Sequence, residues 1–88
     1  MDHQTVERAL RGEGWRDIRV QRDPPGMFYP SHAHPMTTAH VIIQGSMRLI
    51  LGGVTRELTV GDRCDVPANA EHEARIGPQG CTYVIGEE

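Results

Sequence analysis

Hydrophobic and polar residues alternate along most of the chain, but one segment near the amino terminus follows a different period. Within residues 5–12, Val6, Ala9 and Leu10 recur at the spacing of a helix, and glycines follow. This pattern predicts a helix of about two turns. A helix this short is marginally stable alone, so it needs a surface to pack on.

The other hydrophobic segments are short and end at turn residues, as is typical of β-strands. The pair Gly52-Gly53 predicts a tight hairpin, because glycine tolerates positive φ at both positions. Tight turns are also predicted at 45–46 and 77–80. The predicted strands cover residues 15–22, 27–34, 39–44, 47–51, 54–60, 63–67, 72–76 and 82–86. Many short strands with regular turns indicate an all-β fold, either a small barrel or a sandwich.

Length and composition limit the chain to one globular domain. Its 88 residues are 38% hydrophobic and 24% charged, which is typical of a soluble domain. We expect residues 1–14 to form a helical segment that packs on a barrel formed by residues 15–88. The net charge is -3, and no basic run indicates nucleic-acid binding.

The sequence also bears on location and redox state. No apolar stretch approaches the ~20 residues of a membrane span, and the amino terminus lacks the apolar segment of a signal peptide. We therefore predict a cytoplasmic protein without membrane contacts. Cys64 and Cys81 are predicted to be small buried side chains. A disulfide between them is the alternative, which a reducing compartment disfavours.

Four of the five histidines are candidate metal ligands. His32 and His34 are separated by one residue, and in a strand this spacing places both on one face, roughly 6–7 Å apart. Both imidazoles can then approach one ion at ~2.0–2.1 Å. His40 follows a predicted turn and His72 begins a distant strand, so neighbouring strands can bring both alongside. The alternative is that these histidines are structural or solvated, as we expect for His3.

The residues around these histidines resemble the two motifs of the cupin superfamily. The first motif is roughly G-x5-H-x-H-x3,4-E-x6-G, and the matching residues are Gly26, His32, His34 and Gly45. The second is roughly G-x5-P-x-G-x2-H-x3-N, and the matching residues are Gly61, Pro67 and His72. The resemblance covers about residues 15–86.

Three positions depart from the motifs. Asn69 replaces the middle glycine of the second motif, which fits because Asn also tolerates the left-handed conformation. Ile76 stands where the last Asn would be, and Thr38, a poor metal ligand, stands where the glutamate of the first motif would be. His40 follows two residues later and is expected to face the same way. It is therefore a candidate either for the fourth ligand position or for the polar wall of the site.

The resemblance implies an antiparallel β-barrel of the cupin or jelly-roll type, with a metal site inside it. One divalent ion would be held by His32, His34 and His72, with His40 as fourth ligand. Imidazole ligands do not identify the ion, so iron, zinc, nickel, manganese and copper all remain candidates.

Cupins include dioxygenases, isomerases, decarboxylases and non-catalytic binding domains. Such a site would bind a small-molecule ligand or substrate, and two functions therefore stay open for the protein. One is a small metal-dependent enzyme, such as a dioxygenase acting on a small chelating molecule. The other is a non-catalytic metal or small-ligand binding or sensor domain. The sequence identifies no catalytic residues.

Strand alternation predicts which side chains face the barrel interior. The residues expected to face inward are Phe28 with His32, Ile42 with His40, and Ala74 and Ile76 with His72. The polar residues expected on the surface are Tyr29, Arg48 and Tyr83. The lining of the interior is therefore predicted to be mostly apolar.

The same alternation places Val41 and Ile43 on the outer face, where β-branched side chains need a cover. Either the amino-terminal helix of the same chain or a second copy of the chain can supply it. Because a core this small gains from extra burial, we predict a symmetric homodimer.

Overall fold

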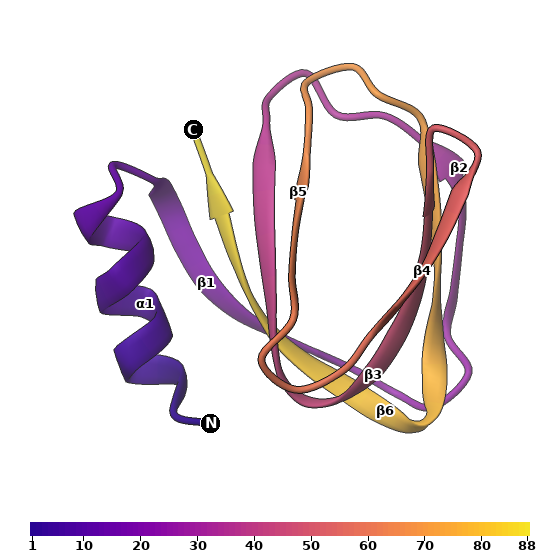
Figure 1. The fold of residues 1–88 in the computed structure, drawn as a ribbon, viewed down its shortest axis with the longest axis horizontal. Helices are drawn as coiled ribbons and strands as arrows, with labels where there is room; N and C mark the ends of the chain where they lie inside the picture. The colour runs from indigo at the N-terminus through magenta and orange to yellow at the C-terminus, as the bar shows by residue number, and fades with distance from the viewer.

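A computed structural model describes residues 1–88 as one helix and six strands (Figure 1). The elements are α1 (His3–Gly12), β1 (Arg16–Asp23), β2 (Phe28–His32), β3 (Thr38–Leu51), β4 (Val54–Leu58), β5 (Arg63–Val66) and β6 (His72–Glu87). All strand pairs are antiparallel. The predicted all-β fold with one short amino-terminal helix is therefore confirmed.

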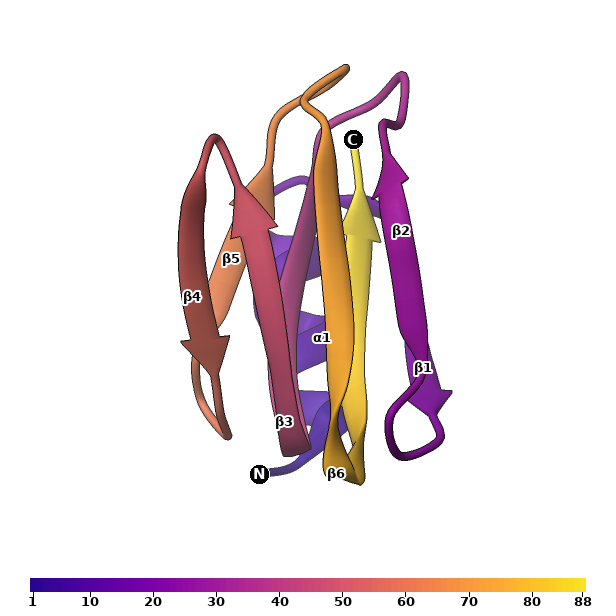
Figure 2. The same cartoon turned by 90° about the vertical axis from the view of Figure 1, so that its right-hand side faces the viewer.

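The two longest strands, β3 and β6, pair with each other and bend together, so each contributes to both walls of the fold (Figures 1 and 2). The first half of β6 pairs with β2, and the second half of β3 pairs with β4. The second half of β6 pairs with β1, and the first half of β3 pairs with β5. One wall is therefore β2-β6-β3-β4 and the other is β1-β6-β3-β5. The sheet is barrel-like without closing completely.

The bend lies where the sequence predicted two tight turns, and that prediction was wrong. Residues 45–46 and 77–80 lie inside β3 and β6, which continue through them. Gly45 has a φ of +79°, and a Cβ there would overlap the carbonyl oxygen of Gly80. The two glycines therefore let paired strands bend in close backbone contact. The hairpin at Gly52-Gly53, between β3 and β4, is confirmed.

Helix α1 lies outside the two walls, beside β1 (Figure 1). It begins two residues before the predicted start, because the Asp2 carboxylate caps it by accepting a hydrogen bond from the Gln4 N–H at 3.1 Å. Its buried residues, Val6 and Leu10, share one apolar cluster with Val41 and Ile43.

The outward direction of Val41 and Ile43 is confirmed, and the helix of the same chain covers them. Each of the two side chains is only 8% exposed. A second copy is therefore not needed to bury this face, and the homodimer stays a prediction. Light scattering at tens of micromolar protein checks it. The expected mass is twice the 9.8 kDa of one chain, and the mass of a single chain would contradict the prediction.

The contact between α1 and the outer face is expected to contribute much of the fold's stability. Leu10 is 1% exposed, so Leu10→Ala should lower the free energy of unfolding by about 2–5 kcal/mol through lost burial and a cavity. The exposed neighbour Arg11 provides the control. Arg11→Ala should change the free energy of unfolding by about 0.5 kcal/mol or less. Urea denaturation measures both. Equal stability of the two variants would show that α1 does not pack as described.

Two further sequence predictions concern the thiols and the membrane. Cys64 and Cys81 are buried and free, as predicted. Helix α1 is neither long nor apolar enough to cross a bilayer. The cytoplasmic location stays a prediction.

Candidate metal centre

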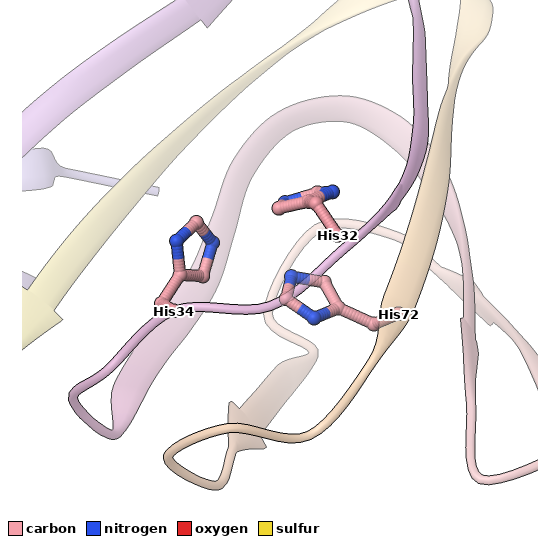
Figure 3. A group of neighbouring side chains, drawn as sticks. All are labelled: His32, His34 and His72. Carbon is pink, nitrogen blue, oxygen red and sulfur yellow. The ribbon is translucent and has the colours of Figure 1, made fainter.

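Three of the four predicted ligands come together (Figure 3). His32 ends β2, His34 lies in the loop that follows, and His72 begins β6, where it pairs with His32. One nitrogen from each ring lies within 4.8 Å of the other two. The ring centroids are 4.3 to 5.1 Å apart. Small side-chain rotations are therefore enough to direct three imidazoles at one ion.

Backbone carbonyls orient two of these imidazoles. Nδ1 of His32 lies 2.7 Å from the carbonyl oxygen of Pro30, and Nδ1 of His72 lies 3.0 Å from that of Ala70. Because a carbonyl oxygen only accepts, both Nδ1 atoms donate, and each Nε2 keeps its lone pair for a ligand. Histidines that bind metals typically make this second hydrogen bond. The donor set therefore fits a divalent metal ion.

The loop between β5 and β6 positions His34. Asn69 has a φ of +64°, the left-handed conformation expected at the position where the motif has glycine. Its backbone N–H donates to the carbonyl oxygen of His34 at 2.6 Å. The Ser31 hydroxyl donates to the Glu71 carboxylate at 3.1 Å and ties the same two segments together. The second motif thus positions a candidate ligand of the first.

Burial dominates the electrostatics of the remaining imidazoles. It lowers the pKa of His34, and electrostatic repulsion from the neighbouring His32 and His72 lowers this pKa further. Burial also lowers the pKa of His40 to about 4, against the opposing effect of a hydrogen bond to the backbone of Cys64. Both groups therefore favour the neutral form, which is the form that binds metal.

His40 lies in the same cavity but outside the group of three. Its Nδ1 is 3.4 Å from the carbonyl oxygen of Cys64 on β5, and its ring centroid is 6.0 Å from that of Tyr83. In this arrangement His40 forms part of the cavity wall. Its direct binding to the ion stays a prediction.

The burial of His40 makes the free energy of unfolding depend on pH. Its unfolded-state pKa is about 6.5, and its folded pKa is about 4, so the unfolded chain takes up the proton first. The contribution of His40 is therefore present above pH 6.5 and is lost as the pH falls toward 4. Between pH 6.5 and 5, metal-free protein should lose about 1–2 kcal/mol more stability than its His40→Gln variant. Urea denaturation at both pH values checks this, and equal losses would contradict it.

The histidines line a cavity of about 290 Å³ between the two walls. Its apolar lining residues are Met47, Leu49, Ala74 and Ile85. Its other polar lining residues are Arg19, Gln21, Tyr29, Thr38, Tyr83 and Glu87. The inward direction of Ala74 and His40 is confirmed, but the lining is more polar than predicted.

The prediction for Phe28 and Tyr29 was wrong because β2 contains a bulge. Two residues separate Tyr29 from His32, whereas only one separates their partners, Ala74 and His72. The extra residue reverses the alternation, so Tyr29 faces the cavity with His32. Phe28 is 43% exposed and lies on the outer face.

Tyr83 was also wrongly predicted to be a surface residue. It pairs with Ile42, which faces inward, and residues paired across a sheet share a face. The same register brings Glu87 opposite Thr38. Glu87 lies four residues after Tyr83 on the same strand, so strand alternation places both on the cavity side. This spacing is visible in the sequence and could have predicted the position of Glu87. Arg48 is exposed and forms an ion pair with Glu57, as expected of a surface residue.

Two polar features of the cavity were not foreseen from the sequence. Glu87 pairs with Arg19 at 3.0 Å. Thr38 Oγ1 is the one buried side-chain oxygen or nitrogen without a hydrogen-bond partner. Leaving a buried hydroxyl without a hydrogen-bond partner is unfavourable, and this oxygen exposes almost no surface to the cavity.

Comparison with known proteins decides the family. A family model for the cupin domain matches residues 19–82 of the chain. The chain belongs to the cupin family. The match includes all three histidines of the triad, so the candidate metal ligands of this cupin lie within the matched segment.

Solved structures similar to this cupin include an enzyme. The DMSP lyase DddQ from Ruegeria pomeroyi is 25% identical, with a TM-score of 0.74, over 81% of this chain and 36% of that one. An RmlC-like cupin from Shewanella frigidimarina is 24% identical, with a TM-score of 0.73, over 80% of this chain and 62% of that one.

The cupin domain of Cnp3 from Schizosaccharomyces pombe has the same fold at 15% identity, with a TM-score of 0.74, over 80% of this chain and 50% of that one. The chain therefore spans less than two thirds of the length of each of these proteins. No curated protein sequence matches the chain.

Proposed function

We propose that this cupin binds one divalent metal ion through His32, His34 and His72, and that a small chelating molecule binds to the ion from the cavity. The observation that carries the proposal is the orientation of the triad, in which two Nδ1–H groups are bound to backbone carbonyls and two Nε2 atoms are free. When bound, the ion supplies Lewis acidity and, in the case of iron, redox chemistry with dioxygen.

The other cavity residues would bind and orient the molecule. Three neutral imidazoles leave the double charge of the ion uncompensated, which favours an anionic chelating group. The apolar side chains of Met47, Leu49 and Ile85 would exclude water from the rest of the ligand.

We propose that the reaction is a dioxygenase reaction on the chelating molecule. The similarity to an enzyme of the cupin fold, the lyase at 25% identity, supports a catalytic role but not a particular reaction. Oxygen uptake by iron-loaded protein, tested with diketones, thiols and phenolic acids, measures this activity. We expect uptake with at least one class and its loss in His72→Ala. No uptake with any class would contradict the dioxygenase reaction.

A non-catalytic ligand-binding or sensor domain is the second candidate, and one observation favours it. No free acid or base lines the cavity apart from imidazoles, since Glu87 is paired with Arg19 and the tyrosine hydroxyls donate to a buried carboxylate. Ligand binding to metal-loaded protein without turnover would support this candidate.

A further inference from the structure

A buried carboxylate beneath the cavity binds both tyrosines that line it. Asp23, the last residue of β1, is 6% exposed. Its Oδ2 accepts hydrogen bonds from the Tyr29 hydroxyl at 2.9 Å and the Tyr83 hydroxyl at 2.7 Å. Its Oδ1 accepts one from Nε2 of Gln21 at 2.9 Å. Three donors from three positions are therefore directed at one carboxylate.

This arrangement fixes what the tyrosines offer to a ligand. A phenolic hydroxyl has one proton to donate, and here both protons are directed at Asp23. Each oxygen keeps lone pairs, so toward the cavity both tyrosines can only accept. The negative charge of Asp23 lies directly behind them.

The hydroxyls keep this role over the ordinary pH range. Burial, followed by the hydrogen bond to Asp23 and its charge, raises the pKa of Tyr29 and of Tyr83 above ten. Neither group is therefore available as a base in the free protein, which argues for recognition rather than proton transfer.

The tyrosines and the histidine triad share one cavity but lie at different levels of the barrel. The triad lies at the His72 end of β6, whereas Asp23 pairs with Cys81, near the bend of that strand. The Tyr29 ring centroid is 6.3 Å from that of His32. A molecule that reaches from the ion toward the bend would therefore meet the tyrosine oxygens.

We propose that Tyr29 and Tyr83, held by Asp23, form a second binding site in the cavity for the hydrogen-bond donor end of a ligand. The ligand class is a short carboxylic acid that binds the ion at one end and carries a hydroxyl or ammonium group at the other. This inference rests on the proposed function, because it assumes that the acid group is bound by the ion. A methyl group at the same position would leave the acceptors unsatisfied, and a second carboxylate would be repelled by Asp23.

Three acids with the same number of non-hydrogen atoms test the site: 3-aminopropionate, 3-hydroxypropionate and butyrate. Each, with its homologue one carbon longer, is titrated into Co²⁺-loaded protein, and the visible bands of the cobalt report binding. In at least one length series, the amino and hydroxy acids should bind about 10-fold more tightly than the methyl acid. Tyr29→Phe leaves Asp23 two other donors and should reduce this preference several-fold. Phe28→Leu, on the outer face of the same strand, should retain it.

The outcomes separate this inference from the proposed function. If no acid changes the cobalt bands, the ion has no position open to the cavity, and both proposals are wrong. If all acids bind but the donor acids show no preference in either series, only the second binding site is wrong. A preference that survives unchanged in both Tyr29→Phe and Tyr83→Phe would also overturn it, because the donor would then bind elsewhere.

Discussion

Replacing His34 or His72 by alanine is expected to weaken metal binding by about 100-fold or more, which removes most of the bound metal at micromolar concentrations. Each replacement takes one of three imidazoles from a site that has no carboxylate ligand. Removing a residue that only hydrogen-bonds to a metal ligand typically weakens metal binding 10–100-fold. Removing a ligand itself should weaken binding at least as much. Competition against a chromophoric chelator measures the affinity.

Two other histidines provide graded controls for this prediction. His3 lies on α1, where its Nδ1 is 2.7 Å from the Glu7 carboxylate, so His3→Ala should bind metal as the wild type does. His40→Ala should weaken binding less than His34→Ala, since His40 lies outside the group of three. Full metal occupancy in a variant that combines His32→Ala with His72→Ala would overturn the site.

Gly45→Ala is expected to lower the free energy of unfolding by about 3 kcal/mol or more. The added Cβ would overlap the carbonyl oxygen of Gly80, and alanine would have to adopt a φ of +79°. The left-handed conformation alone costs an L-residue about 1–2 kcal/mol, and overpacking against backbone adds about 1–3 kcal/mol. Urea denaturation measures the loss.

Gly53 provides the matched control, because its φ of +76° is similar but nothing lies within 4 Å of an added Cβ. Gly53→Ala should therefore show the conformational cost alone, about 1–2 kcal/mol. If both variants lose the same stability, the close contact between β3 and β6 at the bend is not as described.

The fold was predictable from the sequence where the local pattern and the motifs agreed. The helical segment, the hairpin at Gly52-Gly53 and the outward direction of Val41 all follow from period and turn chemistry, and the structure confirms them. The joining of the segments around Gly45 into one strand did not follow. A glycine in a bend and a glycine in a turn look alike in sequence, and only the partner strand distinguishes them.

The convergence of three candidate ligands was predictable from the sequence, but the cavity wall around them was not. The H-x-H spacing and the distant His72 gave the triad, because the two motifs fix which strands meet. Tyr29 was assigned to the wrong face because one extra residue in β2 reverses the alternation, and the position of a bulge depends on pairing. Asp23 gave no signal in the sequence, since its partners Tyr29 and Tyr83 lie six and sixty residues away.

Metal content is the most direct test of the central claim that this cupin holds one divalent ion on three imidazoles. Protein purified without a histidine tag should contain a first-row divalent metal, or bind one when it is supplied, at a stoichiometry of one ion per chain. Elemental analysis by mass spectrometry identifies the ion and gives this ratio. The ratio should fall to near zero in the variant that combines His32→Ala with His72→Ala. Protein that binds none of iron, zinc, nickel, manganese or copper would contradict the claim.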